Sequence, residues 1–210
     1  MDNIIYVLAV NAIPLLLAIT LHEAAHGYAA RMFGDRTAEM LGRISLNPIR
    51  HIDWIGTVAL PAFLTLIKSP FLFGWAKPVP VNARNLRNPK TDMIWVAAAG
   101  PLANLAMGTA WALLFRFGGG ASPAIAAIAD AGVYWNLMLM IFNLLPILPL
   151  DGGRIVAGLL PGPLSYKFSR MEPYGFFIVL ALIAVPGLLS TVLGPLRNVA
   201  LSFFGAVAGV

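Results

Sequence analysis

The chain opens with a long apolar run that ends in three ionisable side chains. The run extends from Ile4 to Leu21 and is followed at once by His22-Glu23-Ala24-Ala25-His26. About 20 apolar residues cross the hydrocarbon core of a bilayer, and a helix is the structure that satisfies the backbone of one such segment. The fold must therefore include a membrane helix that carries titratable groups, which are costly in hydrocarbon unless they have a function.

His22 and His26 lie on one face of this expected helix. Four residues correspond to about 400° of rotation and roughly 6 Å of rise, so both imidazoles can bind the same metal ion. Glu23 lies about 100° further around the axis, where it can act on a water molecule at the metal but is poorly placed as a third ligand. His-Glu-x-x-His is the pattern of zinc hydrolases. A surface helix with scattered polar residues is the alternative interpretation, and the membrane-length run before the motif makes it less favourable.

Composition extends the membrane assignment to the whole chain. Apolar residues make up 59% of the sequence and charged residues 11%, whereas soluble domains have about half and a quarter. We expect an all-α polytopic membrane protein, a compact bundle of about four to six transmembrane helices. It forms one domain over residues 1–210, with a core over about 3–155 and C-terminal helices over about 172–210.

Cysteine and charge exclude other classes of site. The chain has no cysteine, so disulfides and thiolate zinc sites are excluded. The net charge is +5, but the 14 lysines and arginines lie in short connections between apolar runs. That distribution indicates membrane topology, and we expect no nucleic-acid partner.

Three membrane helices are expected in the first 155 residues. The first runs from about Asn3 to Phe33, the second from Met93 to Phe117, and the third from about Gly132 to Asn143. The start of the chain lacks a basic region and a small-residue cleavage site, so we expect the first helix to be retained. Residues 118–123 are expected to form a flexible loop, and Ala124 to Asp130 a short interfacial turn.

The apolar run from Trp54 to Ile67 decides the topology. If it spans the membrane, the basic residues are divided between the two sides of the membrane with no excess on either. If it enters and returns through residues 74–82, one side holds twelve of the fourteen basic residues. The positive-inside rule then predicts a re-entrant, β-hairpin-like segment, an extracytoplasmic N-terminus and a cytoplasmic exit for the first helix. Pro78 and Pro80 forbid helix here and favour an extended strand with one free edge.

Two histidines leave a tetrahedral zinc site one protein ligand short, with the fourth position kept for water. The candidates for the third ligand are Asp151, Glu39, Asp53 and His51. Asp151 is favoured because it follows a long apolar run at the cytoplasmic depth inferred for the two histidines. The other three lie in a basic polar connection. In place of binding the metal, His51 and Asp53 could line the entrance to the site or pair with nearby arginines.

Asp151 is followed by Gly152 and Gly153, which allow a tight turn with the backbone close to another group. A helix end capped by Asp-Gly is the alternative. In the second membrane helix, Gly100 and Asn104 lie one turn apart on a small-residue face. Gly100 is explained by close helix packing, while Asn104 is suited to a hydrogen bond across a helix interface.

With these motifs in view, the chain resembles the site-2 protease family of intramembrane zinc metalloproteases. His22 to His26 matches the family's HExxH helix, and the segment Asn143-Leu144-Leu145-Pro146-Ile147-Leu148-Pro149-Leu150-Asp151-Gly152 matches its NxxPxxxxLDG motif. Ala99 to Asn104 resembles the family's intervening helix, and residues 74–82 occupy the place of its membrane-associated β-hairpin. The resemblance covers roughly residues 15–155, and the chain departs from many members in having neither a PDZ module nor a CBS pair.

The resemblance implies one Zn²⁺ per chain, with His22, His26 and Asp151 as ligands and Glu23 as the catalytic acid and base. Asn143, and with it Asn104, is expected near the substrate carbonyl as an oxyanion group. The implied function is regulated intramembrane proteolysis of a transmembrane protein or peptide, in the plasma membrane with the active site toward the cytoplasm. A metal-ion transporter and an inactive scaffold of the same fold are the alternatives. A transporter needs ligands along a path through the bundle, and a scaffold does not need Glu23.

Overall fold

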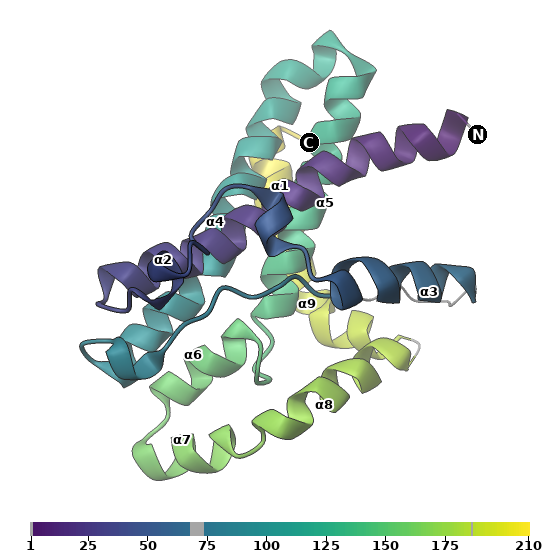
Figure 1. The fold of residues 1–210 in the computed structure, drawn as a ribbon. Helices are drawn as coiled ribbons and strands as arrows, with labels where there is room; N and C mark the ends of the chain where they lie inside the picture. The colour runs from purple at the N-terminus through teal and green to yellow at the C-terminus, as the bar shows by residue number, and fades with distance from the viewer. Residues whose placement is uncertain (1, 68–73, 186) are drawn as a thin grey trace.

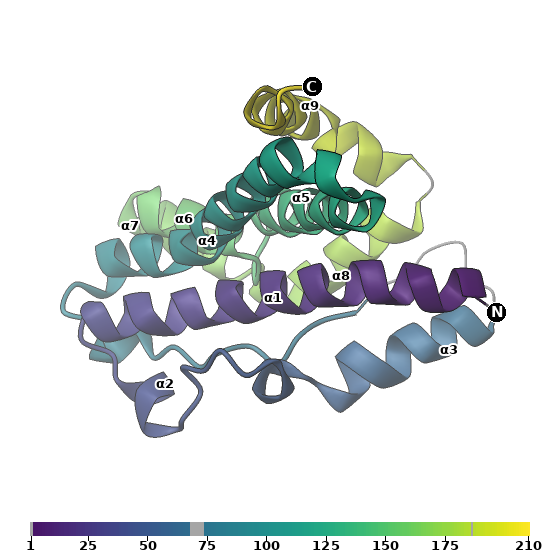
Figure 2. The ribbon, with the colours of Figure 1, turned by 90° about the horizontal axis from the view of Figure 1, so that it is seen from above.

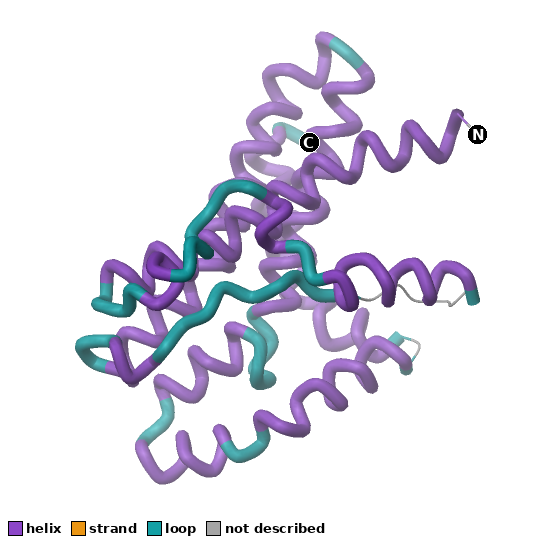
Figure 3. Tube along the Cα trace, in the orientation of Figure 1, coloured by secondary structure: helices purple, strands orange, loops and turns teal. Residues whose placement is uncertain are grey.

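The computed structural model describes residues 2–67, 74–185 and 187–210, and this described part is helical with no strand (Figures 1 and 3). Its α-helices are α1 (Asp2–Met32), α2 (Thr37–Met40), α3 (Leu60–Leu66), α4 (Pro89–Gly118), α5 (Pro123–Asn143), α6 (Asp151–Leu159), α7 (Gly162–Ser169), α8 (Glu172–Ala184) and α9 (Leu188–Ala208). A π-helical segment, Trp54–Ala59, leads directly into α3. The expected all-α class is confirmed.

Four helices in the described part are long and apolar enough to cross a membrane. They include Ala9–Met32 of α1, Pro89–Ala121 in and just after α4, and the whole of α5 and α9. At about 1.5 Å per residue, each exceeds or matches the roughly 30 Å of a bilayer core. The chain is therefore a multi-pass membrane protein. The third helix is longer than predicted: residues 124–130 form no separate turn, because Pro123 at the first helical position and the Ser122 side chain, which accepts a hydrogen bond from the backbone amide of Ala124, start α5 there.

The centre of the bundle is an antiparallel pair, α4 and α5, with α1 lying across one side and α9 on the other (Figure 2). Small residues make this close packing possible. A side-chain carbon on Gly132 of α5 would lie 2.3 Å from the Trp111 ring of α4, and one on Gly108 would lie 2.7 Å from Phe204 of α9. Phe204 and Leu193 are the buried residues that attach α9 to this core. The bundle thus holds α1 against α4, which positions the histidines.

Between α1 and α4 the chain leaves the bundle and returns beside its own path. The backbone amide of Trp75 donates to the carbonyl of Gly56 at 3.2 Å, and the Thr57 hydroxyl donates to the carbonyl of Trp75 at 2.8 Å. Residues 74–82 then run along the bundle as an extended coil (Figure 1). The expected strand is not formed in the described residues, and the turn that would complete a hairpin, residues 68–73, lies outside them. The amides of Trp75, Lys77 and Val79 are already bonded, to Gly56, His51 and Glu23 respectively, so less of the predicted free edge is available.

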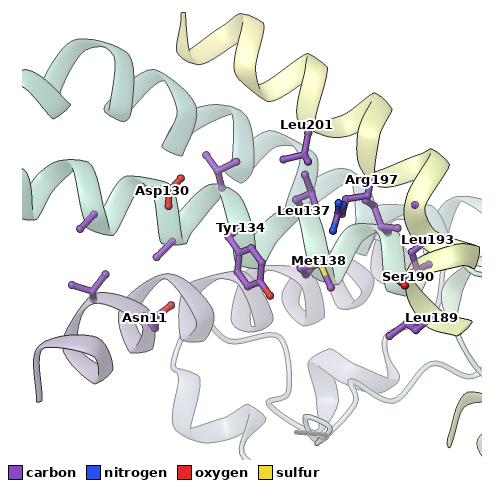
Figure 4. A pocket seen from close by; sticks show the side chains of 16 residues that line it. Asn11, Asp130, Tyr134, Leu137, Met138, Leu189, Ser190, Leu193, Arg197 and Leu201 are labelled. Carbon is purple, nitrogen blue, oxygen red and sulfur yellow. The ribbon is translucent and has the colours of Figure 1, made fainter. Parts of the chain in front are cut away.

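Among the described residues, a large cavity adjoins the bundle but does not contain the predicted site. It has a volume of about 750 Å³ and lies between α1, α5 and α9. Figure 4 shows Asp130 and Tyr134 of α5 and Arg197 of α9 among its mostly apolar walls. The smaller cavity, of about 380 Å³, contains His22, Glu23, His26 and Asp151. The chemistry of its side chains, and not its size, makes the smaller cavity the candidate site.

Candidate metal centre

The histidines come from the C-terminal third of the long helix α1, where it packs against α4. The helix continues unbroken through Pro14 and through the motif, so His22 and His26 project from one face as their spacing predicts. Their rings meet edge to face with centroids 4.7 Å apart. Their Nε2 atoms lie 3.1 Å from each other.

Asp151 approaches the same point from α6, of which it is the first residue. Its Oδ2 lies 3.3 Å from Nε2 of His22, and its Oδ1 lies 3.4 Å from Nε2 of His26. The two glycines after it permit this approach: a side-chain carbon on Gly152 would lie 2.2 Å from the carbonyl oxygen of Leu144, and one on Gly153 would lie 2.5 Å from the backbone of Ile147. The predicted close passage of the backbone at Gly152 and Gly153 is confirmed.

The imidazole nitrogens and the carboxylate lie close enough together to hold one metal ion, with one ligand atom from each residue within 4.8 Å of the others. Zinc bonds of about 2.0–2.2 Å at tetrahedral angles place neighbouring ligand atoms about 3.3–3.5 Å apart. The two Nε2 atoms are 3.1 Å apart, and the distances from His22 and His26 to Asp151, 3.3 and 3.4 Å, run to different oxygens of its carboxylate. His22 is 6% and Asp151 9% exposed, and Oδ2 of Asp151 is buried without a hydrogen bond. A buried carboxylate oxygen without a partner is costly, and a cation among these three residues removes that cost.

The second nitrogen of each imidazole determines where its proton lies. Nδ1 of His26 is 2.7 Å from the carbonyl oxygen of Val96, which only accepts, so this nitrogen is the donor. Nδ1 of His22 is 2.6 Å from Oδ1 of Asn104, whose amide group donates to Ala18 and Asn136. With the proton on Nδ1, a neutral ring at either position directs the lone pair of Nε2 toward the same point. Two lone pairs 3.1 Å apart repel each other unless a cation lies between them.

Gly100 of α4 makes room for both rings. A side-chain carbon at this position would lie 2.4 Å from Nε2 of His26 and 2.6 Å from Cε1 of His22. The predicted close packing at Gly100 is confirmed, but the neighbour is the pair of imidazoles and not only another helix backbone.

Glu23 shares the cavity with the three ligand residues and binds none of them. Its Oε2 accepts a hydrogen bond of 2.8 Å from the backbone amide of Val79 in the extended segment. The backbone of the extended segment therefore holds this carboxylate in the wall of the cavity.

The other predicted residues divide between the cavity and the surrounding structure. Asn143 lines the cavity and uses one amide hydrogen on the carbonyl of Leu139, 3.0 Å away. Asn104 is 0% exposed and lies behind His22, outside the cavity, so its position does not suit contact with a substrate.

The remaining candidates for a third ligand are bonded elsewhere. Glu39 pairs with Arg31 at 3.0 Å and Arg36 at 3.3 Å. Asp53 accepts hydrogen bonds from the amides of Ile55 and Gly56, and His51 is 2.8 Å from the carbonyl of Ser45.

Sequence reasoning missed two residues of this site. The amide of Val79 contacts Glu23 from 56 positions away in the chain, and no sequence signal distinguishes it. Arg154 also lines the cavity. Its position one helical turn after Asp151 was a signal, because residues three apart on a helix lie on the same face.

Comparison with known proteins supplies the family. The model of Peptidase family M50 matches residues 120–185. The chain is 39% identical over 194 residues to YwhC of Bacillus subtilis (strain 168), named as a candidate zinc metalloprotease, covering 89% of this chain and 84% of that protein. It is 27% identical over 175 residues to Rip2 of Mycolicibacterium smegmatis, named in the same way, covering 82% and 66%.

A third relative is the zinc metalloprotease MJ0392 of Methanocaldococcus jannaschii, 28% identical over 172 residues that cover 80% of this chain and 39% of that protein. No solved structure matches the chain significantly. The 39% identity to YwhC over most of both proteins, together with the matched family model, carries the assignment. The chain belongs to peptidase family M50, the site-2 protease family that its motifs resemble.

Proposed function

We propose that this protein is an intramembrane zinc metalloprotease that hydrolyses peptide bonds of membrane-embedded substrates. One observation carries the proposal: the two imidazole Nε2 atoms lie 3.1 Å apart, each lies 3.3–3.4 Å from one oxygen of the Asp151 carboxylate, and Glu23 lines the same cavity. The names of its relatives in family M50 support zinc as the metal.

His22, His26 and Asp151 hold the zinc, one ion per chain. Two imidazoles and one carboxylate form a donor set that zinc hydrolases use, leaving a position open. When bound, zinc acts as a Lewis acid toward the peptide carbonyl and makes water a better nucleophile. Asn104 and the carbonyl of Val96 orient the two rings, and we assign Asn104 this supporting role in place of the expected contact with substrate.

Glu23 acts as the general base and then as the general acid. Its carboxylate accepts a proton from the attacking water and returns it to the nitrogen of the leaving amine. The hydrogen bond from the amide of Val79 fixes one carboxylate oxygen and leaves the other for the proton. Asn143 retains one amide hydrogen that can donate to the developing oxyanion, a contribution of about 3 kcal/mol per donor in comparable sites.

The substrate must expose its peptide bond, because a transmembrane helix uses its carbonyls internally and must unwind locally. The extended segment 74–82 borders the cavity with Trp75, Val79 and Val81, and it offers a wall along which an unwound segment can lie extended. The lipid bilayer is the other partner.

Orientation follows from the distribution of charge. We place the N-terminus outside the cytoplasm and the exit of α1, residues 31–53 and residues 82–90 in the cytoplasm, with 54–82 re-entrant. The return of Trp75 to Gly56 supports this path. The metal centre then lies within the membrane toward its cytoplasmic side, and the plasma membrane is the proposed location.

The two alternative functions predict other arrangements. A metal-ion transporter needs ligands along a path, whereas the group of three or more potential ligands found in the described residues is the cluster of His22, His26 and Asp151. An inactive scaffold does not require Glu23 beside that cluster.

Glu23→Gln provides the test. The amide is nearly isosteric but cannot act as a base, so the variant should retain zinc while cleavage of a model transmembrane substrate falls by about 10²- to 10⁴-fold or more. Zinc is measured by elemental analysis of the purified protein and cleavage by mass spectrometry after reconstitution. Glu39→Gln, which changes a carboxylate outside the cavity, is the control. A Glu23→Gln protein with wild-type cleavage and full activity in cells would refute the proposal.

A further inference from the structure

The cavity that holds the metal centre contains one lysine or arginine among the described residues that line it, Arg154. Its neighbours are otherwise the ligand residues, Glu23, Asn143 and a largely apolar wall that includes Trp75, Val79 and Leu150. Neither the metal nor the proposed proton transfer requires this cation. Its charge is therefore available for another purpose.

Arg154 is placed at the rim of the cavity and not at its centre. It lies three residues after Asp151 on α6, so the two side chains leave the helix on the same side with Cβ atoms about 5–6 Å apart. The Arg154 side chain is 41% exposed, whereas that of Asp151 is 12% exposed. A guanidinium in this position reaches a side chain of the bound polypeptide and leaves the reacting carbonyl to the centre.

The group that Arg154 holds in this structure is a carboxylate. Its Nη2 lies 3.4 Å from Oε1 of Glu172, the first residue of α8, and the Glu172 side chain is 45% exposed. An ion pair this long and this exposed contributes little stability. A carboxylate that binds the guanidinium with two parallel hydrogen bonds would replace it at small cost.

We propose that Arg154 is a substrate subsite for an acidic side chain, which gives the enzyme a preference for aspartate or glutamate close to the cleaved bond. The inference rests on the proposed protease function. Glu23 and Asp151 repel a second carboxylate at the centre of the cavity, so the acidic side chain is directed to the rim. The 5–6 Å between the Cβ atoms of Asp151 and Arg154 correspond to about two residues of extended chain. Because the arginine side chain adds to this reach, the acidic residue of the substrate falls within about three residues of the cleaved bond.

The experiment compares matched substrates in proteoliposomes. A model transmembrane peptide is made with glutamate or glutamine at each of the three positions on either side of its mapped cleavage site, and kcat/KM is measured for each pair. Wild-type protein should favour glutamate by about five- to tenfold at one position, as expected for a charge-assisted contact at a partly exposed site. Arg154→Gln should bring that ratio to about one, because cleavage of the glutamate peptide should fall more than cleavage of the glutamine peptide. Arg154→Lys retains the positive charge but not the planar guanidinium that can donate two parallel hydrogen bonds. Its glutamate-to-glutamine ratio should therefore lie between those of the wild type and Arg154→Gln.

Glu172→Gln tests the same contact from the other partner. Removing the competing carboxylate should raise the preference for glutamate about two- to threefold, while Glu39→Gln, whose carboxylate pairs with Arg31 and Arg36 elsewhere, should leave it unchanged. Zinc content verifies that each variant is folded. If Arg154→Gln does not fold, the result for Glu172→Gln decides whether Arg154 forms the proposed subsite.

A wild-type ratio near one at every position would overturn the inference. An equal loss of both peptides in Arg154→Gln would also overturn it, because that result indicates a purely structural ion pair. Failure of the proposed function gives a different result, in which wild-type protein cleaves no peptide faster than Glu23→Gln does.

Discussion

At the scale of single residues, a glycine and an asparagine on α4 support the candidate metal centre formed by His22, His26 and Asp151. Gly100 leaves the space that both imidazoles occupy, and Asn104 fixes the ring of His22. Neither touches the point where the metal is proposed to bind. Their positions one turn apart on α4 are what make α1 and α4 a single site.

Gly100→Ala should weaken zinc binding although it adds only a methyl group. The new carbon would lie 2.4 Å from Nε2 of His26, so a ring must move and lose its hydrogen bond, and loss of such support typically costs 10- to 100-fold in metal affinity. Competition with a chelator measures this. Gly120→Ala is the matched control, because a carbon there meets nothing within 4 Å. Equal zinc affinity in the two variants would contradict the role of Gly100.

Replacing any one of His22, His26 and Asp151 by alanine should remove most of the zinc, because two remaining ligands bind it weakly. His51→Ala should retain it, since the His51 ring contacts the carbonyl of Ser45 and lies outside the ligand group. Elemental analysis of purified protein measures both. Stoichiometric zinc in Asp151→Ala would place the third ligand elsewhere.

At the scale of elements, Asp35 fastens the end of α1 to the segment that follows the extended coil. It is fully buried, and its oxygens accept hydrogen bonds from the amide of Thr37 at 3.0 Å, the amide of Asn82 at 2.6 Å and the side chain of Asn85 at 3.0 Å. Burial raises the pKa of Asp35, but the hydrogen bonds from Thr37, Asn82 and Asn85 outweigh that effect and hold the pKa below its ordinary value of 3.8. The charged carboxylate therefore stabilises the segment that borders the cavity.

Asp35→Asn should lower the free energy of unfolding by about 1–3 kcal/mol at neutral pH, because one amide oxygen cannot accept all of these bonds. A depressed pKa gives stability that is present above 3.8 and lost as the pH falls below it through the lowered pKa. The difference in free energy of unfolding between wild type and Asp35→Asn should thus become smaller in strong acid. Thermal unfolding in detergent at several pH values measures it, with Glu39→Gln as reference. A difference independent of pH would exclude the charged form as the cause.

At the scale of the whole molecule, the C-terminal end of α1, the start of α4 and the short helices α2, α6 and α7 lie toward the same end of the bundle (Figures 1 and 2). The candidate metal centre, His22, His26 and Asp151, lies where α1, α4 and α6 pack together. If the basic connections lie in the cytoplasm, as the positive-inside rule predicts, the candidate metal centre is reached from the cytoplasm.

Single cysteines can test this arrangement, because the chain has none. Met40→Cys and Arg84→Cys lie at exposed positions on either side of the returning segment. Both should react with a membrane-impermeant maleimide only when the cytoplasmic face is accessible. Labelling of the two positions from opposite sides would show that residues 54–82 span the membrane.

The sequence by itself determined the parts of the protein that depend on local geometry. An apolar run of membrane length dictates a helix, and the spacing of His22 and His26 places both rings on one face whatever lies beside it. The glycines after Asp151 likewise indicated a close backbone approach, which the structure confirms.

Only the tertiary structure decided what those residues face. The contact of Asp151 with histidines about 130 positions earlier, the space above Gly100 and the amide of Val79 on Glu23 all arise where separate segments pack together. Periodicity along one segment carries no information about its neighbour's rotation or depth, so Asn104 was expected at the substrate and lies instead behind His22, holding its ring.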